Sequence, residues 1–109
     1  METSHVRKSL GEETTFAQDI ISHEKLIIEL NKIIDSLCVE INKRNLVAKT
    51  LILKIKYFNF KFHTKSKIFP LYFHKKDMIQ KIALELFDEL YASPLATRLM
   101  GLSVSNINH

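Results

Sequence analysis

The chain has 109 residues, of which 46% are hydrophobic and 26% are charged, and it carries a formal net charge of +4 with a pI near 9.2. This length fits one compact domain with a single modest core, and the composition excludes an intrinsically disordered chain. No apolar run approaches the roughly 20 residues of a membrane-spanning helix, and no signal peptide precedes the fold. The sequence therefore predicts a globular cytoplasmic protein.

The first residues of the chain predict a short leader followed by a strand. Met1–His5 is expected to be a leader or an addition for expression, so the domain is assigned to residues 6–109. Residues 6–16, VRKSLGEETTF, read as a strand with a bulge or a close backbone approach at Gly11.

Two amphipathic helices are predicted, one before and one after the middle of the chain. Ser22 can cap a helix of about 20 residues that ends near Arg44. A second helix is expected from about His74 or Lys75 to Tyr91, ended by a turn at residues 92–94. Their apolar stripes are Ile20, Ile27, Leu30, Ile34, Leu37 and Ile41, and Ile79, Ile82, Ala83, Leu86 and Leu90.

Between the helices, residues 46–69 alternate with the period of a strand in two halves, which predicts an antiparallel hairpin. A tight turn is expected near Phe58–Asn59, and Pro70 is expected to close the second strand. The expected cross-strand pairs are Tyr57 with Phe60, Lys56 with Lys61, Ile55 with Phe62 and Lys54 with His63. One face of the hairpin is then apolar and the other is basic.

The predicted basic face consists of Lys54, Lys56, Lys61, His63, Lys65 and Lys67. Like charges that face each other across a strand pair are destabilising, so stability gives no reason to collect them there. Residues 41–76 hold ten of the sixteen Lys and Arg residues and no Asp or Glu, whereas the rest of the chain holds all twelve acids. The segregation indicates a surface for a polyanion. The alternative is that these lysines simply solvate an edge strand and guard it against aggregation.

A last strand is predicted within residues 96–107, with Met100, Leu102 and Val104 toward the core. The order strand, helix, strand, strand, helix, strand predicts an α+β fold, a βαββαβ ferredoxin-like sandwich. In that fold a four-stranded sheet carries both helices on one face and leaves the basic face open.

The residue types on these elements do not assemble into a catalytic or metal site. No convergent set of acids, bases and nucleophiles is evident, Cys38 fits a buried helical position, and the five histidines lack ligand-like spacing. Because Tyr57, Phe60 and Phe62 are assigned to the core, the open face lacks aromatics for base stacking. It suits phosphate contacts, which position a duplex without reading its bases.

Three stretches carry a resemblance to a known family: RKSLGEETTF, TLILKIKYFNFKFHTKSKIF and RLMGLSVSNI, together with the helix after the second. In this order they resemble the C-terminal little finger domain of Y-family translesion DNA polymerases, most of all the DNA polymerase IV class. The resemblance covers about Arg7 to Asn106. It implies the same fold and a domain that grips the primer-template backbone in double-stranded DNA.

The resemblance also implies contact positions and partners. The implied DNA contacts are Lys8, Ser9, Gly11, Thr64, Lys65, Ser66, Lys67, Arg98, Gly101, Ser103 and Ser105. Glu12 and Ser103 stand where some relatives carry arginine. The fragment is expected to bind DNA without catalysis or a cofactor, while its parent enzyme would use magnesium for DNA synthesis past lesions in DNA repair and replication. The implied partners are the parent's catalytic core and a sliding clamp, with no membrane and, in a bacterium, association with the nucleoid.

Two rival functions stay open at this point. The first is an unrelated ferredoxin-like module that binds RNA, which a preference for single-stranded RNA over duplex DNA would favour. The second is a protein-interaction or regulatory domain whose basic face meets an acidic partner or a second subunit. That function predicts a stable oligomer with little response to DNA.

Overall fold

The computed structural model describes residues 9–90 and 96–108. Its elements are β1 (Ser9–Ile20), α1 (His23–Lys43), β2 (Ala48–Tyr57), β3 (Phe62–Phe73), α2 (Lys76–Leu90) and β4 (Thr97–Ser105). The predicted order of strands and helices is confirmed.

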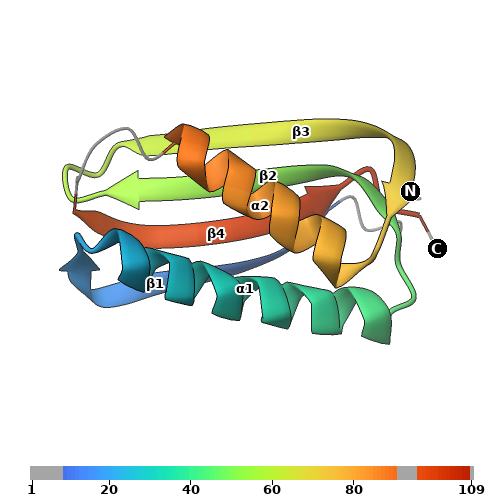
Figure 1. Ribbon diagram of the computed structural model, residues 1–109, viewed down its shortest axis with the longest axis horizontal. Helices are drawn as coiled ribbons and strands as arrows, with labels where there is room; N and C mark the ends of the chain where they lie inside the picture. The colour runs from blue at the N-terminus through green and yellow to red at the C-terminus, as the bar shows by residue number, and fades with distance from the viewer. Residues whose placement is uncertain (1–8, 91–95, 109) are drawn as a thin grey trace, which may run out of the picture.

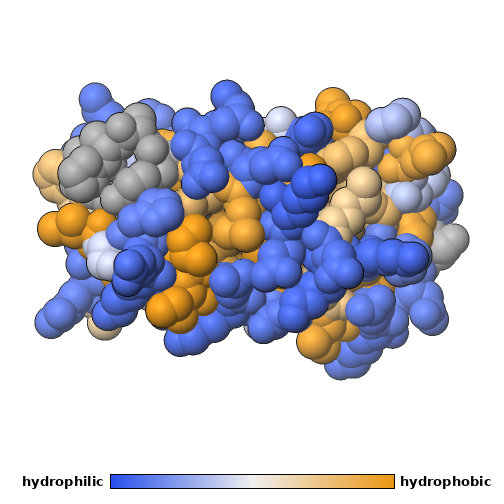
Figure 2. All heavy atoms as spheres, viewed as in Figure 1, coloured by the Kyte–Doolittle hydropathy of each residue, from blue (hydrophilic) through white to orange (hydrophobic). Residues whose placement is uncertain are grey.

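The four strands form one sheet in the order β1-β4-β2-β3, and every neighbouring pair is antiparallel. Both helices lie on the same face of this sheet, α1 over β1 and β4 and α2 over β2 and β3 (Figure 1). The predicted α+β sandwich with one open sheet face is thus confirmed. Seen from the helix side, the outer surface is mostly hydrophilic, with hydrophobic residues gathered in patches (Figure 2).

The core lies between the sheet and the helices. Leu53 of β2 pairs with Leu102 of β4, and Ile55 pairs with Met100, and all four side chains are buried. The predicted inward positions on these two strands are therefore confirmed. Both helices also bury residues outside the predicted stripes, namely Leu26, Ile33, Cys38 and Phe87, while Ile27 and Leu90 are only partly buried. The assignment of Ile20 to the stripe of the first helix was wrong, because Ile20 is the last residue of β1.

Helix α1 begins where its capping residue predicts. The Ser22 side chain accepts a hydrogen bond from the Lys25 amide at 3.2 Å, which satisfies one of the amides that the first turn leaves without a helical partner. Farther along, Cys38 is buried, and burial raises the pKa of its thiol. The predicted core role of Cys38 is confirmed.

The hairpin turn differs from the prediction by one residue. Phe60 adopts a φ of 65° and donates its amide to the Tyr57 carbonyl at 2.9 Å, while the Tyr57 amide donates to the Lys61 carbonyl at 3.1 Å. These bonds close a three-residue loop, residues 58–60, whose last residue is left-handed. Tyr57 therefore lies opposite Lys61 and not opposite Phe60.

A slip of one residue turns every side chain of a strand to the other face. The observed pairs are Lys56 with Phe62, Ile55 with His63, Lys54 with Thr64, Leu53 with Lys65, Ile52 with Ser66 and Leu51 with Lys67. The predicted pairs of Lys56 with Lys61 and Lys54 with His63 were wrong. Lys61, His63, Lys65 and Lys67 share the helix-covered side of β3, whereas Phe62, Thr64, Ser66 and Ile68 share the open side.

Two predicted strand ends were also wrong. β1 continues past Phe16 to Ile20, and β3 passes through Pro70 to Phe73 after a register shift opposite Ala48–Thr50. β3 is an edge strand, and no strand pairs with its outer side. A proline, which has no amide hydrogen, can therefore lie there without removing a hydrogen bond from the sheet. The predictions on Met1–His5, Lys8 and the turn at 92–94 lie outside the described residues.

Candidate nucleic-acid interface

The open face of the sheet is lined by small and polar side chains from all four strands. Cross-strand pairing places on it Ser9, Gly11, Glu13, Ile52, Lys54, Lys56, Thr64, Ser66, Gly101, Ser103 and Ser105. The predicted pairing of Ile55 with Phe62 placed Thr64 and Ser66 on the core side together with Phe62. That placement was wrong, because the loop is one residue longer than predicted and pairs Thr64 with Lys54 and Ser66 with Ile52. The face therefore carries more hydroxyls and fewer cations than the sequence predicted.

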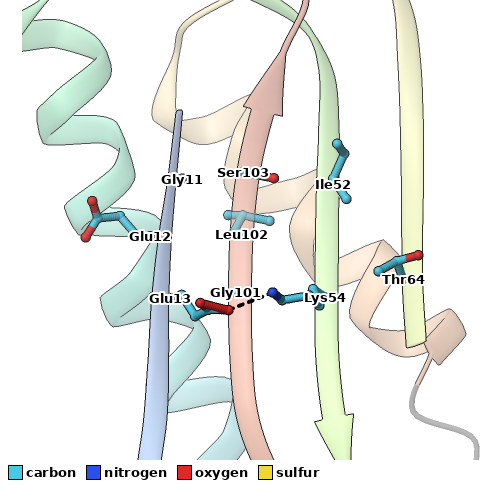
Figure 3. A pocket seen from close by; sticks show the side chains of 9 residues that line it. All are labelled: Gly11, Glu12, Glu13, Ile52, Lys54, Thr64, Gly101, Leu102 and Ser103. Atoms are coloured by element: carbon cyan, nitrogen blue, oxygen red, sulfur yellow. Dashed lines mark ion pairs between the residues drawn. The ribbon is translucent and has the colours of Figure 1, made fainter. Parts of the chain in front are cut away.

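A hollow of about 330 Å³ lies at the centre of this face. Its lining residues are Gly11, Glu12, Glu13, Ile52, Lys54, Thr64, Gly101, Leu102 and Ser103 (Figure 3). The Glu12 side chain points away from it, toward α1 (Figure 3). The hollow combines exposed backbone, hydroxyl groups and one lysine, which are the groups that bind phosphate oxygens.

An ion pair crosses the hollow from β1 to β2, over the intervening strand β4. Glu13 of β1 and Lys54 of β2 both pair with Gly101 of the intervening strand β4. Because Gly101 has no side chain, the Lys54 Nζ reaches the Glu13 Oε1 at 2.8 Å above it (Figure 3). Lys54 is therefore neutralised locally by a carboxylate that the sequence analysis did not single out.

Gly11 is required by the close packing of β1 against β4. It pairs with Ser103, and a Cβ atom added at Gly11 would lie 2.8 Å from the Ser103 Cβ. Real Cβ atoms do not approach that closely, so a side chain there would force the two strands apart. The predicted close backbone approach at Gly11 is confirmed. At Gly101, by contrast, the nearest atoms lie at an ordinary 3.5 Å.

Aromatic rings and cations gather at the hairpin end of the open face. The Lys56 Nζ lies 5.0 Å from the ring centroids of both Phe60 and Phe62. The Lys54 Nζ lies 5.2 Å from the Phe62 ring, and the Arg98 Cζ lies 4.5 Å from the Phe60 ring. Phe60 is 60% exposed and Phe62 53% exposed, so their assignment to the core was wrong. We call these five residues the aromatic-cation cluster.

The basic residues of β3 make their contacts on the helix side of the sheet. The Lys65 Nζ lies 3.2 Å from the Glu89 Oε1 of α2, and the His63 ring packs edge-on against Tyr57 with centroids 5.1 Å apart. These side chains do not join the open face. The predicted plate of six basic residues is reduced to Lys54 and Lys56, with Arg98 beside them.

The sites proposed from the sequence are thus split between two sides of the sheet. The open side brings together Ser9, Gly11, Lys54, Lys56, Thr64, Ser66, Gly101, Ser103 and Ser105, with Arg98 at the hairpin end. The other side holds Lys61, His63, Lys65 and Lys67. Glu13, Phe60 and Phe62 were missed. The position of Glu13 on the open face could have been predicted from the alternation of side chains along β1. The positions of the two phenylalanines depend on the length of the hairpin loop.

Residues 9–90 and 96–108 contain no group of three or more His, Cys, Asp or Glu side chains that could hold a metal ion. They also contain no helix long and apolar enough to cross a membrane.

Known proteins share this sequence pattern. A family model described as the impB/mucB/samB family C-terminal domain matches residues 7–109. DNA polymerase IV of Leptospira interrogans serogroup Icterohaemorrhagiae serovar copenhageni is 33% identical over 115 residues, covering 99% of this chain and 32% of that protein. DNA polymerase IV of Streptococcus sanguinis is 32% identical over 105 residues, covering 96% of this chain and 30% of that protein. The chain spans about a third of the length of these curated relatives.

Solved structures share the fold. The insertion ternary complex of Dbh DNA polymerase matches with a TM-score of 0.78 and 21% identity, covering 91% of this chain and 28% of that chain. A complex of the β-clamp processivity factor and the little finger domain of PolIV matches with a TM-score of 0.65 and 26% identity. That match covers 89% of this chain and 86% of the other, so a single folded unit of similar extent is known.

Proposed function

Since this chain belongs to the impB/mucB/samB C-terminal domain family, the little finger domains of Y-family DNA polymerases, we propose that its open sheet face binds duplex primer-template DNA. One observation carries the proposal: the central hollow of that face combines Lys54, the hydroxyls of Thr64 and Ser103, and the exposed backbone of Gly11. Such groups bind the sugar-phosphate backbone and carry no sequence information. The domain therefore holds DNA of any sequence.

The strength of this grip depends on how many phosphates the cations neutralise. Lys54 and Lys56 lie on the open face and are the side chains proposed to contact phosphates directly. Each contact releases condensed counterions, so affinity falls with rising salt by roughly 0.9 logarithmic units per contact. Glu13 competes with phosphate for Lys54, since its carboxylate lies 2.8 Å from that ammonium group.

The basic residues on the helix-covered side of β3 are proposed to attract DNA without contacting it in the hollow. Lys61, His63, Lys65 and Lys67 are exposed along the edge of the sheet, although they do not face the hollow. Exposed cations raise the local concentration of DNA through long-range attraction. We expect these four residues, and Lys8, to speed or strengthen encounter with DNA rather than to fix its position.

The parent protein is proposed to be a template-directed DNA polymerase that copies past lesions. Its relatives by name are DNA polymerase IV enzymes, and a polymerase of this kind requires divalent metal such as magnesium for nucleotidyl transfer. The described part of this chain offers no acidic cluster for that metal, so the metal is expected at carboxylates of a catalytic core. The domain would then contribute grip and processivity, and not chemistry, to a cytoplasmic enzyme.

A sliding clamp is a further proposed partner. One structure similar to this chain is described as a complex of the β-clamp processivity factor with a little finger domain. A domain that holds both DNA and a ring around DNA would keep the parent enzyme on its template. The catalytic core of the parent and the clamp are therefore both expected to contact this domain.

The test measures binding of the 109-residue chain to a primer-template duplex and to a single strand of equal length, by fluorescence anisotropy between 50 and 200 mM salt. Weak binding that prefers the duplex, ignores sequence and falls steeply with salt is the expected result. Tighter binding of single-stranded RNA than of duplex DNA would instead support an RNA-binding module. A stable oligomer that binds neither nucleic acid would overturn the proposal in favour of a protein-interaction domain.

A further inference from the structure

The aromatic-cation cluster lies at one end of the open face, next to the central hollow. Lys54 belongs to both, because it lines the hollow and its Nζ lies 5.2 Å from the Phe62 ring. Lys56 pairs with Phe62 across the hairpin, so the cluster continues the same face toward the loop. A nucleic acid strand that lies in the hollow can therefore continue onto the two rings.

Burial does not account for the two phenylalanines. Each side chain leaves more than half of its surface in water, whereas the core-facing residues of the adjacent strand, such as Ile55, are buried. Exposed aromatic side chains on an open sheet face are the usual platform on which unpaired bases stack. A base in a duplex is already stacked on its neighbours, so only an unpaired base can use such a platform.

Charge narrows the class of ligand further. Three cations surround the two rings. Two of them have a carboxylate partner: the Glu13 Oε1 lies 2.8 Å from the Lys54 Nζ, and the Asp19 Oδ1 lies 3.3 Å from the Arg98 Nε. Within residues 9–90 and 96–108, Lys56 makes no ion pair, which leaves its charge available to an anion. Flat aromatic faces bordered by cations match a nucleotide, whose base is flat and whose phosphate is anionic.

We propose that Phe60 and Phe62 form a stacking site for unpaired nucleotides of single-stranded DNA where it leaves the duplex. In this site the bases stack on the two rings, and Lys56 and Arg98 bind the phosphates between them. The site rests on the proposed function, because the duplex in the hollow delivers the single strand to the cluster. It adds a second ligand class, unpaired DNA, to the duplex.

The test compares a blunt duplex with the same duplex that carries a single-stranded extension of about six thymidines. Stacking on an aromatic side chain contributes roughly 1–3 kcal/mol per base, so the extension should raise the affinity of the unchanged chain about tenfold. Phe60→Ala with Phe62→Ala should abolish this gain and leave binding of the blunt duplex within about twofold. Phe60→Tyr with Phe62→Tyr keeps the stacking faces and should keep the gain.

Phe58 provides the matched control. It belongs to the same loop and is 48% exposed, but in the described residues no cation lies over its ring. Phe58→Ala should therefore leave the gain from the extension intact. Two results would overturn the stacking site. One is that Phe58→Ala abolishes the affinity gain from the extension. The other is that the double alanine variant loses affinity equally for the blunt and the extended duplex. Absence of any binding to the blunt duplex would instead overturn the proposed duplex function.

A measurement on the unchanged chain makes the test independent of how the variants fold. An extension that carries 5-iodouracil is irradiated in the complex, and the crosslinked peptide is mapped by mass spectrometry. Crosslinks at Phe60 or Phe62 are the expected result, because this base reacts with the aromatic ring on which it stacks. Crosslinks confined to other residues would contradict the proposal.

Discussion

The two central strands, β2 and β4, differ from the edge strand β3 in how their buried and exposed side chains are distributed between the two faces. Along β2 the residues from Leu51 to Tyr57 alternate between buried and half-buried. Along β3 every residue from Phe62 to Ile68 is exposed, whichever face it lies on. Strands β2 and β4 therefore each have one buried face, and β1 buries only Leu10 and Ile20, whereas residues 62–68 of β3 are exposed on both faces.

This difference means that the core fixes the register of β2 but not that of β3. A shift of β2 by one residue would move Leu53 and Ile55 from the core into water and bring lysines into the core. A similar shift of residues 62–68 of β3 would only exchange exposed side chains. The register of β3 is instead set by the loop at residues 58–60, with Phe60 in its left-handed conformation.

The largest expected effect contrasts one apolar residue from each region. Leu53→Ala removes a fully buried side chain of β2 and should lower the free energy of unfolding by about 2–5 kcal/mol. Ile68→Ala removes a side chain that is 71% exposed on β3 and should change it by less than about 0.5 kcal/mol. Urea unfolding followed by circular dichroism measures both. Similar losses for the two variants would show that β3 is packed more tightly than its exposure indicates.

The next effect concerns the spacing of β1 and β4 at the two glycines. Gly11→Ala places a Cβ 2.8 Å from the Ser103 Cβ and should destabilise the fold by about 1–3 kcal/mol through overpacking. Gly101→Ala is the matched control, since its new Cβ would meet only ordinary contacts at 3.5 Å. We expect Gly101→Ala to change the free energy of unfolding by less than about 1 kcal/mol.

Thermal unfolding of both variants and of a Gly11→Ala, Ser103→Gly double variant checks this contrast. The double variant removes the clashing Cβ of Ser103 and should recover much of the stability lost in Gly11→Ala. An unchanged melting temperature for Gly11→Ala would show that β1 moves away from β4 at little cost.

The same contrast explains what the sequence could predict. The alternation of Leu51, Leu53 and Ile55 and of Met100, Leu102 and Val104 identified the correct core face, because water and the core impose opposite preferences on those strands. It also placed Lys54, Lys56, Gly101 and Ser103 correctly on the open face. Hydrophobic pattern is a reliable guide wherever one face is buried.

For β3 the pattern gave no such guide. Phe60 and Phe62 are large and apolar, which made a core position the natural interpretation, yet both are exposed beside cations. The number of residues in the loop, two or three, determines which face of the sheet each side chain of β3 lies on. Neither loop has a glycine at a left-handed position that would reveal its length. Phe60 adopts a conformation that its side chain disfavours, so the loop length could not be read from residue types.

The third prediction separates the lysines of the two regions by their effect on DNA binding. Lys54→Ala with Lys56→Ala removes two cations from the open face and should reduce the salt slope of duplex binding by about two units. Lys65→Ala with Lys67→Ala removes two cations from the other side of β3 and should reduce it by less than about half a unit. Fluorescence anisotropy at several salt concentrations gives both slopes. Equal reductions would place duplex DNA at the edge of the sheet, not over the hollow.

The smallest expected effect concerns the carboxylates that pair with these lysines. Glu13→Gln releases Lys54 on the open face, and Glu89→Gln releases Lys65 on the helix side. Both pairs are substantially exposed, so each substitution should change the free energy of unfolding by less than about 1 kcal/mol. The two variants therefore match in charge and in stability, and differ only in where the freed lysine lies.

Their effects on duplex binding should diverge. If phosphate must displace Glu13 from Lys54, then Glu13→Gln removes a competitor worth up to about 1 kcal/mol and should raise the affinity up to about fivefold. Glu89→Gln should leave the affinity unchanged at 0.15 M salt, where charges farther than about 8 Å from the DNA are largely screened. A rise in both variants would mean that affinity follows net charge alone, and the carboxylate over Gly101 would then have no specific part in DNA binding.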